Sequence, residues 1–267
     1  MDAAPAGRAP GRVGLCPCHR AGNHPPGTQK NELKPWQHEE WCIPEASAAF
    51  VYAMEDVLAL YAEEYDPAYP TVCLDEKPVV LHAQPRPLHA ATSGPDGHVE
   101  RRDYEYVRAG TANLFVLVEP LAGWRHVAVT ARRTKADYVE QLRYLADEVY
   151  PNAEYIRLVQ DNLNTHTLAA LYEVFPPAEA ARLAERFEVH YTPKHGSWLN
   201  MAEIEISIVQ RGCLARPVAD TPILTRRVAA LEAERNAAHC PIRWQFTVDD
   251  ARSKLHDLYP VHKIKTD

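Results

Sequence analysis

Three acidic residues stand where the expected elements of the chain could bring their carboxylates together. The run TVCLDEKPVVL, residues 71–81, predicts a first strand that ends at Asp75. The run Ile156–Gln160 predicts a buried strand, and Asp161 follows it directly. Glu203 lies in the first turns of a later predicted helix. If the two strands are neighbours, Asp75 and Asp161 converge at one edge of the sheet, and Glu203 faces them.

Three carboxylates so close together repel one another strongly in a poorly hydrated site. Divalent cations relieve this repulsion, and oxygen ligands are the ones that Mg²⁺ and Mn²⁺ prefer. Two such ions, roughly 3.5–4 Å apart, can activate a water and stabilise the leaving oxygen of a phosphodiester. The acids therefore predict a phosphodiester-cleaving site with two divalent ions.

Nearby residues offer other interpretations. Glu76 directly follows the first acid, so in a strand it points to the opposite face. Glu205 lies about 200° around a helix from Glu203, so both cannot face one metal site, and we favour Glu203. Asp161 has a competing role as the N-cap of the following helix. A lone histidine such as His166 is more often structural than catalytic.

The elements that must position these acids follow from apolar periodicity, caps and turns. In chain order they are a helix within 41–65, the strand 71–81, a hairpin over 111–130 turning at 120–123, a helix over 135–150, the strand Ile156–Gln160, a helix through Leu168, Leu171 and Phe175, a helix over 178–187, a strand over 188–192, and helices capped by Ser197, started at Thr221 and capped by Thr247 with Leu255 and Leu258 on the last one. This order predicts an α/β fold with a mixed sheet, three antiparallel strands followed by alternating helices and strands, and helices on both faces.

Composition narrows the class of protein. The chain has 267 residues, of which 46% are hydrophobic and 24% charged, as in ordinary soluble globular proteins. No apolar run approaches the ~18 residues that span a bilayer, and no secretory signal is evident, so we expect no membrane partner and a cytoplasmic location. Six scattered cysteines favour reduced thiols. The net charge of −7 argues mildly against a general electrostatic nucleic-acid binder and leaves local basic groups such as 101–102 and 132–135.

Three regions are expected along the chain. Residues 1–29 are rich in glycine and proline and poor in large apolar residues, so we expect them to be disordered. Residues 30–66 form a helical arm or linker, and residues 67–267 form the catalytic domain with its C-terminal helices.

Six segments together resemble the bacterial insertion-sequence transposases related to mariner elements, the group numbered six-thirty, with a DDE endonuclease domain. They are LDEKP, YVRAGTANLFV, EPLAGWRHV, VQDNLNTHT, HYTPKHGSWLNMAEIE and RWQFTVDDARSKLHDLYP, and the resemblance runs from about Lys30 to Pro260. It implies an RNase H-like fold and a magnesium-dependent transposase that cuts DNA at the ends of an insertion sequence and joins them to a target.

Within these motifs the acids of the family fall on Asp75, Asp161 and Glu203, and the third follows the second by 42 positions. The resemblance also implies that Asn162 and His166 support the site by hydrogen bonds or phosphate contacts. We expect basic residues such as Arg108, Lys194 and His195 to hold DNA phosphates. A homodimer acting on paired terminal inverted repeats in the bacterial nucleoid is expected by resemblance alone.

One departure from the family leaves a second function open. Family members carry an N-terminal helix-turn-helix region that reads the inverted repeats. Here KNELKPW resembles the tail of that region, and nothing helical precedes it, so we interpret 1–29 as a shifted-frame replacement and the chain as N-terminally truncated. The alternative to an active core is therefore a non-catalytic remnant that binds DNA or dimerises with intact copies. A nuclease or resolvase of the same fold would use the same acids, and a glycosidase is a more distant interpretation.

Overall fold

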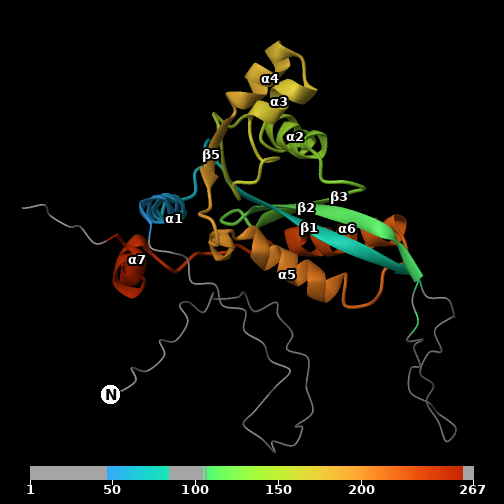
Figure 1. The fold of residues 1–267 in the computed structure, drawn as a ribbon. Coiled ribbons are helices and arrows are strands. Elements are labelled where there is room, and N and C mark those ends of the chain that lie inside the picture. The colour runs from blue at the N-terminus through green and yellow to red at the C-terminus, as the bar shows by residue number, and fades with distance from the viewer. Residues whose placement is uncertain (1–46, 84–104, 106, 261–267) are drawn as a thin grey trace, which may run out of the picture.

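A five-stranded mixed sheet forms the centre of the protein (Figure 1). The computed structural model describes residues 47–83, 105 and 107–260. The strands are β1 Thr71–Ala83, β2 Val107–Glu119, β3 Trp124–Thr130, β4 Ile156–Gln160 and β5 Phe187–Tyr191. Their order is β3-β2-β1-β4-β5, with antiparallel pairs β1–β2 and β2–β3 and parallel pairs β1–β4 and β4–β5. The predicted fold class is confirmed.

Strand β1 does not end at Asp75, so that detail of the prediction was wrong. Only Thr71–Cys73 pairs with β4, whereas β1 from Cys73 to Ala83 continues along β2 as a long ribbon (Figure 1). Among the described strands, β1 beyond Cys73 pairs with β2 alone, and a strand with one unpaired side tolerates Pro78, which cannot donate a ladder hydrogen bond. Asp75 therefore lies at the point where β1 and β4 separate rather than at the end of β1.

Helices cover both faces of the sheet (Figure 1). They are α1 Ala48–Tyr61, α2 Lys135–Tyr144 continued by a π-helical turn Leu145–Val149, α3 Ala169–Val174, α4 Pro177–Ala184, α5 Ala202–Gly212, α6 Thr221–Ala237 and α7 Val248–Lys254. Side chains of α1, α5, α6 and α7 share one apolar cluster with the sheet, and those of α2, α3 and α4 share the other. Residues 72–74 of β1, 114–118 of β2 and 158–159 of β4 are buried, and their side chains alternate between the two clusters.

Three helix boundaries differ from the predictions. Phe187 begins β5 instead of ending α4. Ser197 starts a 3₁₀ turn and caps no helix, because α5 begins only at Ala202 and its N-cap, Met201, gives no side-chain hydrogen bond. Leu255 and Leu258 lie beyond α7, whose predicted cap at Thr247 is present as a capping box. Proline at the start of α6 and glycine in the β2–β3 turn are found as expected.

Helix α1 packs on the sheet within the larger apolar cluster. Phe50, Met54, Val57 and Leu58, at the predicted helical spacing, are all buried there. Predictions for residues 1–29, the first part of 30–66 and the pair 101–102 lie outside the described residues. In the described part of the chain, no helix is long and apolar enough to cross a bilayer.

Candidate active site

The parallel register of β1 and β4 places the two predicted aspartates level with each other. Cys73 pairs with Val159, and both of these side chains lie in the cluster on the α5 face of the sheet. Asp75 and Asp161 each follow two residues later, so the two-residue period of a strand directs both toward that same face. The expected convergence at the separation of β1 and β4 follows from this register.

Asn200 ties the beginning of α5 to β1 and thereby brings Glu203 toward the aspartates. Its Nδ2 donates to the carbonyl oxygen of Leu74 at 2.8 Å and to Oδ2 of Asp75 at 3.4 Å. Its Oδ1 accepts from the backbone N–H of Ala202 at 3.1 Å, the first residue of α5. Asn200 is 2% exposed, so this link is inside the fold and fixes the end of the helix that carries Glu203.

Both of the other acids affect the pKa of Asp75. Burial, with a smaller contribution from the nearby carboxylates of Glu203 and Asp161, raises the pKa of Asp75 to about 7, and the backbone N–H of Glu76, which donates to Oδ1 at 2.7 Å, opposes this rise. The positive imidazole of His166 has a smaller opposing effect. A carboxylate that is desolvated and surrounded by like charge is a place where a cation is favoured.

The two glutamates of α5 face different surroundings. Glu205 is 1% exposed and accepts from Arg235 at 2.7 and 3.0 Å, while Nε of Arg125 lies 3.3 Å from its Oε2. Glu203 is exposed and lies within electrostatic range of Asp75. Glu205 is thus occupied by an internal ion pair with α6 and β3, which leaves Glu203 as the acid available to the site.

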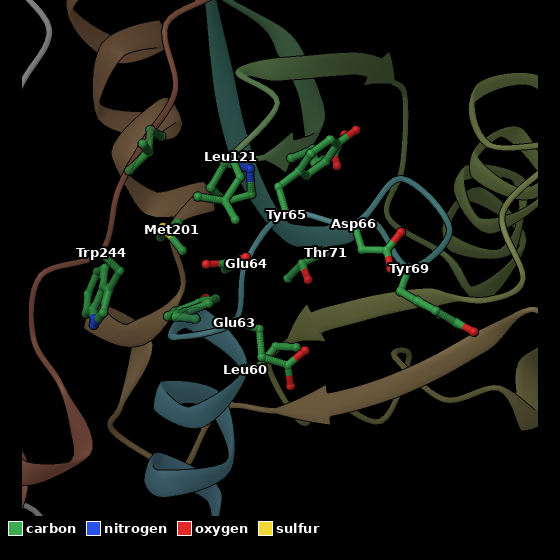
Figure 2. A pocket seen from close by; sticks show the side chains of 14 residues that line it. Leu60, Glu63, Glu64, Tyr65, Asp66, Tyr69, Thr71, Leu121, Met201 and Trp244 are labelled. Carbon is green, nitrogen blue, oxygen red and sulfur yellow. The ribbon is translucent and has the colours of Figure 1, made fainter.

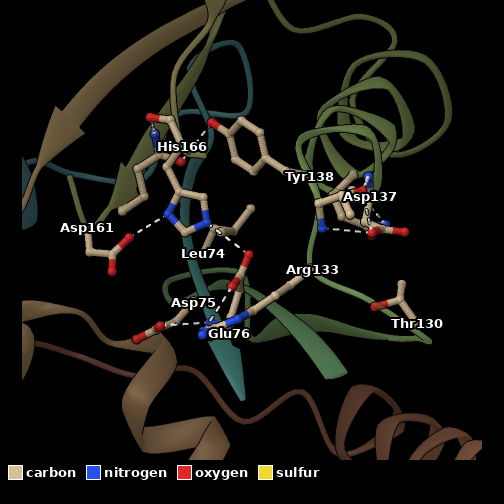
Figure 3. A network of polar contacts seen from close by, with 12 residues as sticks. Leu74, Asp75, Glu76, Thr130, Arg133, Asp137, Tyr138, Asp161 and His166 are labelled. Carbon is tan, nitrogen blue, oxygen red and sulfur yellow. Dashed lines mark hydrogen bonds and ion pairs between the residues drawn. The ribbon is translucent and has the colours of Figure 1, made fainter. Parts of the chain in front are cut away.

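Asp161 makes its side-chain contact with His166 and not with a helix terminus (Figure 3). Nδ1 of His166 donates to Oδ1 of Asp161, and Nε2 donates to Oε1 of Glu76 at 3.0 Å. Burial alone would lower the pKa of His166, but the hydrogen bonds to Asp161 and Glu76 outweigh it and raise the pKa to about 9. The N-cap of α3 is Leu168, which gives no side-chain hydrogen bond, so the alternative role of Asp161 as a helix cap is not found.

A large cleft of about 1070 Å³ opens beside Asp161. Its walls are Ser47, Ala49, Phe50 and Ala53 of α1 and its cap, Asp161–Leu163 after β4, and Tyr191–His195 with Ser197 after β5. Three of the residues predicted to contact DNA, Asn162, Lys194 and His195, are exposed and line this cleft. His195 has a φ of 64°, a left-handed conformation uncommon for a residue other than glycine.

Two other predicted DNA contacts lie elsewhere. His166 is 1% exposed and buried between two carboxylates, so it does not face the cleft. Arg108 is exposed on β2 beside His82, seven residues along β1 from Asp75, which corresponds to roughly 23 Å of strand. The structure therefore separates Arg108 from the three acids.

A second cavity, of about 20 Å³, lies near the start of β1 (Figure 2). Its walls carry the acidic residues Glu63, Glu64, Asp66 and Glu119 beside aromatic rings that include Tyr65 and Trp244. Its size admits about one water molecule, and its negative charge repels phosphate. This cavity is not a candidate for phosphodiester chemistry.

The donor set of Asp75, Asp161 and Glu203 consists of carboxylate oxygens, the ligands that hard divalent cations take. The register of β1 and β4 directs Asp75 and Asp161 to one face, and Asp75 lies within electrostatic range of both Glu203 and Asp161. As the side chains stand, no three His, Cys, Asp or Glu residues of the described segments are close enough to enclose an ion. The acids fit Mg²⁺ or Mn²⁺ in type and placement, and closing around an ion would require side-chain movement.

Sequence reasoning missed two residues of this site. Asn200 carried no signal beyond its place in a loop before a helix, because its partners lie about 125 residues away along the chain. Glu76 was predicted to face away from Asp75, and it does, but its role beside His166 depends on a contact 90 residues apart. The signal available in the sequence was the combination of acids on the two faces of one strand, Asp75 and Glu76, with one histidine, His166.

Solved structures and one family model are similar to this chain. The crystal structures of the Mos1 mariner paired end complex with Mn and with Mg match with TM-scores of 0.47 and 0.48 at 14% identity, over 86% and 87% of this chain and 66% and 69% of theirs. The Mos1 strand transfer complex matches with a TM-score of 0.45 at 13% identity, over 85% and 68%. This chain thus spans about two thirds of the length of those proteins, and a search of curated proteins finds no match. Residues 70–224, more than half of the chain and inclusive of all three acids, match the DDE superfamily endonuclease family, and the chain belongs to it.

Proposed function

We propose that this chain is the catalytic core of a transposase, which cleaves DNA at the ends of an insertion sequence and transfers the strands to a target with Mg²⁺ or Mn²⁺. The observation that carries the proposal is the placement of Asp75, Asp161 and Glu203 on one face where β1, β4 and α5 meet. Family membership supports endonuclease chemistry, and the resemblance of the sequence motifs to insertion-sequence transposases supports the narrower activity.

In this mechanism the carboxylates of Asp75, Asp161 and Glu203 would hold the divalent ions. Bound ions of this kind supply an activated water and neutralise charge on the leaving oxygen. The protein supplies the rigid position of Asp75, fixed by the backbone N–H of Glu76 and by Asn200, and the position of Glu203 at the start of α5. Burial of Asp75 strengthens every electrostatic interaction made there.

The cleft beside Asp161 would receive the DNA backbone. Lys194 and His195 stand exposed on its wall, and Asn162 adds an amide that can reach a phosphate oxygen. Contacts of this type position DNA without reading its sequence. We propose further that two copies act on paired ends of the element, for which the sequence motifs are the support.

The test is cleavage of duplex DNA that carries the flanking sequence of the gene, with Mg²⁺ or Mn²⁺ and with chelator. The wild-type protein should cut, and Asp161→Asn and chelator should each abolish cutting. Asp56→Asn is the matched control, because Asp56 accepts from His190 at 2.8 Å on α1 and has no part in the proposed site. Cutting that persists in Asp161→Asn would refute the assigned role of that residue.

A further inference from the structure

One buried imidazole lies between carboxylates that come from opposite sides of the site (Figure 3). His166 bonds Asp161 through Nδ1 and Glu76 through Nε2, and its side chain is 1% exposed. The side chain of Glu76 is 4% exposed, whereas that of Asp161 is 38% exposed. The chain of contacts thus runs from a fixed carboxylate inside the protein to one that borders the cleft.

The backbone around His166 is also fastened. Its carbonyl oxygen accepts from Nε2 of Gln160 at 3.0 Å and from the hydroxyl of Tyr191 at 3.2 Å. The hydroxyl of Tyr138 donates to Oε1 of Gln160 at 2.9 Å, and its ring lies 4.9 Å from the imidazole. With its backbone and both nitrogens held, the ring has one orientation, and Asp161 is the partner free to adjust.

Glu76 determines that orientation from β1. It occupies the face of the sheet opposite Asp75, and Nη1 of Arg133 lies 3.7 Å from its second oxygen. The same β1 segment therefore supplies one acid directly to the site and, one residue later, the residue that aligns the imidazole. Among the described residues, the hydrogen bond of the Asp161 side chain uses Oδ1 and leaves Oδ2 toward the site.

We propose that Glu76 and His166 are positioning residues for metal binding, in which Glu76 acts through His166 to hold Asp161 with one oxygen engaged and the other available to a divalent ion. This inference rests on the proposed function of the three acids. Ligating carboxylates are commonly oriented by hydrogen bonds of this kind, and loss of such a partner typically weakens metal binding or activity by 10–100-fold.

Mn²⁺ binding to the full chain tests the proposal. It is measured by titration calorimetry or by the loss of the electron paramagnetic resonance signal of free Mn²⁺. Glu76→Gln keeps the shape and an acceptor but removes the charge, and His166→Ala removes the link to Asp161. Both should raise the Mn²⁺ dissociation constant about 10–100-fold. The double variant should bind Mn²⁺ no more weakly than His166→Ala alone, because Glu76 acts through the histidine.

Glu119→Gln is the matched control. Glu119 is also a buried strand glutamate, 2% exposed, and it accepts from the hydroxyl of Tyr150 at 2.7 Å at the C-terminal end of β2. The Glu119→Gln variant should bind Mn²⁺ as the wild type does.

Two further measurements distinguish positioning from a merely structural role. The affinity for DNA without metal should be equal in all variants. A raised Mn²⁺ concentration should restore cleavage to Glu76→Gln, which a merely structural role would not produce.

The outcomes separate this inference from the proposed function. If the wild type binds Mn²⁺, Asp161→Asn abolishes binding, and folded Glu76→Gln binds within twofold of the wild type, the positioning role is wrong and the metal site stands. If the wild type binds no Mn²⁺, the proposed function itself fails. If His166→Ala does not fold, His166→Asn replaces it, because asparagine retains a donor near the position of Nδ1. If folded His166→Asn binds Mn²⁺ with wild-type affinity while Glu76→Gln binds it weakly, Glu76 does not act through the histidine and the proposal is overturned.

Discussion

The glutamates of α5 allow a decisive comparison, because Glu205→Gln and Glu203→Gln should damage different properties. Glu205 is buried and ion-paired with Arg235 and Arg125, and removing its charge leaves the buried guanidinium of Arg125 and the partly exposed one of Arg235 without their carboxylate. Breaking a buried pair in this way costs ~3–5 kcal/mol of unfolding free energy. Glu203 is exposed, and a neutral substitution there should change stability by no more than ~0.5 kcal/mol.

The assay is thermal unfolding beside DNA cleavage on the same preparations. For a protein of this size 1 kcal/mol shifts the melting temperature by roughly 2–4 °C, so Glu205→Gln should melt roughly 6–20 °C lower and keep some cleavage below its transition. Glu203→Gln should melt like the wild type and fail to cut. A stable, inactive Glu205→Gln together with an active Glu203→Gln would refute the assignment of these two residues.

The remaining predictions concern charge, phosphate contact and a turn. In metal-free protein Asp75→Asn should be more stable than the wild type. The pKa of Asp75 is raised to about 7 from 3.8, so the wild type loses stability as the pH rises between these two values. The gain in melting temperature of Asp75→Asn should therefore grow from about pH 4 to pH 7 and then level off. A gain independent of pH would contradict this cause. Lys194→Ala should weaken DNA binding on any sequence and reduce the salt slope by about 1, measured by fluorescence anisotropy, and an unchanged slope would place DNA elsewhere. Gly123→Ala should destabilise the protein by more than ~1 kcal/mol in denaturant unfolding, because φ is +67° and a Cβ would meet the backbone of Cys240 at 3.0 Å; unchanged stability would mean that the turn relaxes at little cost.

Much of the site could be predicted because it depends on strands and their register. Apolar runs located β1 and β4, and the rule that parallel strands bring their following residues to one edge placed Asp75 beside Asp161. The separation of β1 from β4 after Cys73 was not predictable in the same way, since β1 past Asp75 pairs with β2 alone. A strand that loses one neighbour but keeps the other has no local signal for the change.

Residues that act through loops escaped the prediction for a different reason. Ser197 has the side chain of a good N-cap, yet Asn200 uses its own side chain to join α5 to β1, and the helix starts after it. Glu76 was correctly directed away from Asp75, but the histidine that gives it a role comes from the loop after β4. Such contacts are set by the tertiary fold and not by periodicity, which describes only a segment and its own faces.

The three acids are held with unequal rigidity, and this difference has a physical reason. Asp75 lies in the buried part of β1, and Glu203 follows the fastened Asn200, so the backbone positions of these two acids are fixed. Asp161 lies just beyond β4, is partly exposed, and bonds to His166. Without an ion, the positive imidazole draws the third carboxylate away from its like-charged neighbours. A divalent ion that attracts Oδ2 of Asp161 offsets the repulsion among the acids and uses a different oxygen from the one bonded to His166. The hydrogen bond at Oδ1 therefore need not break when the site is filled.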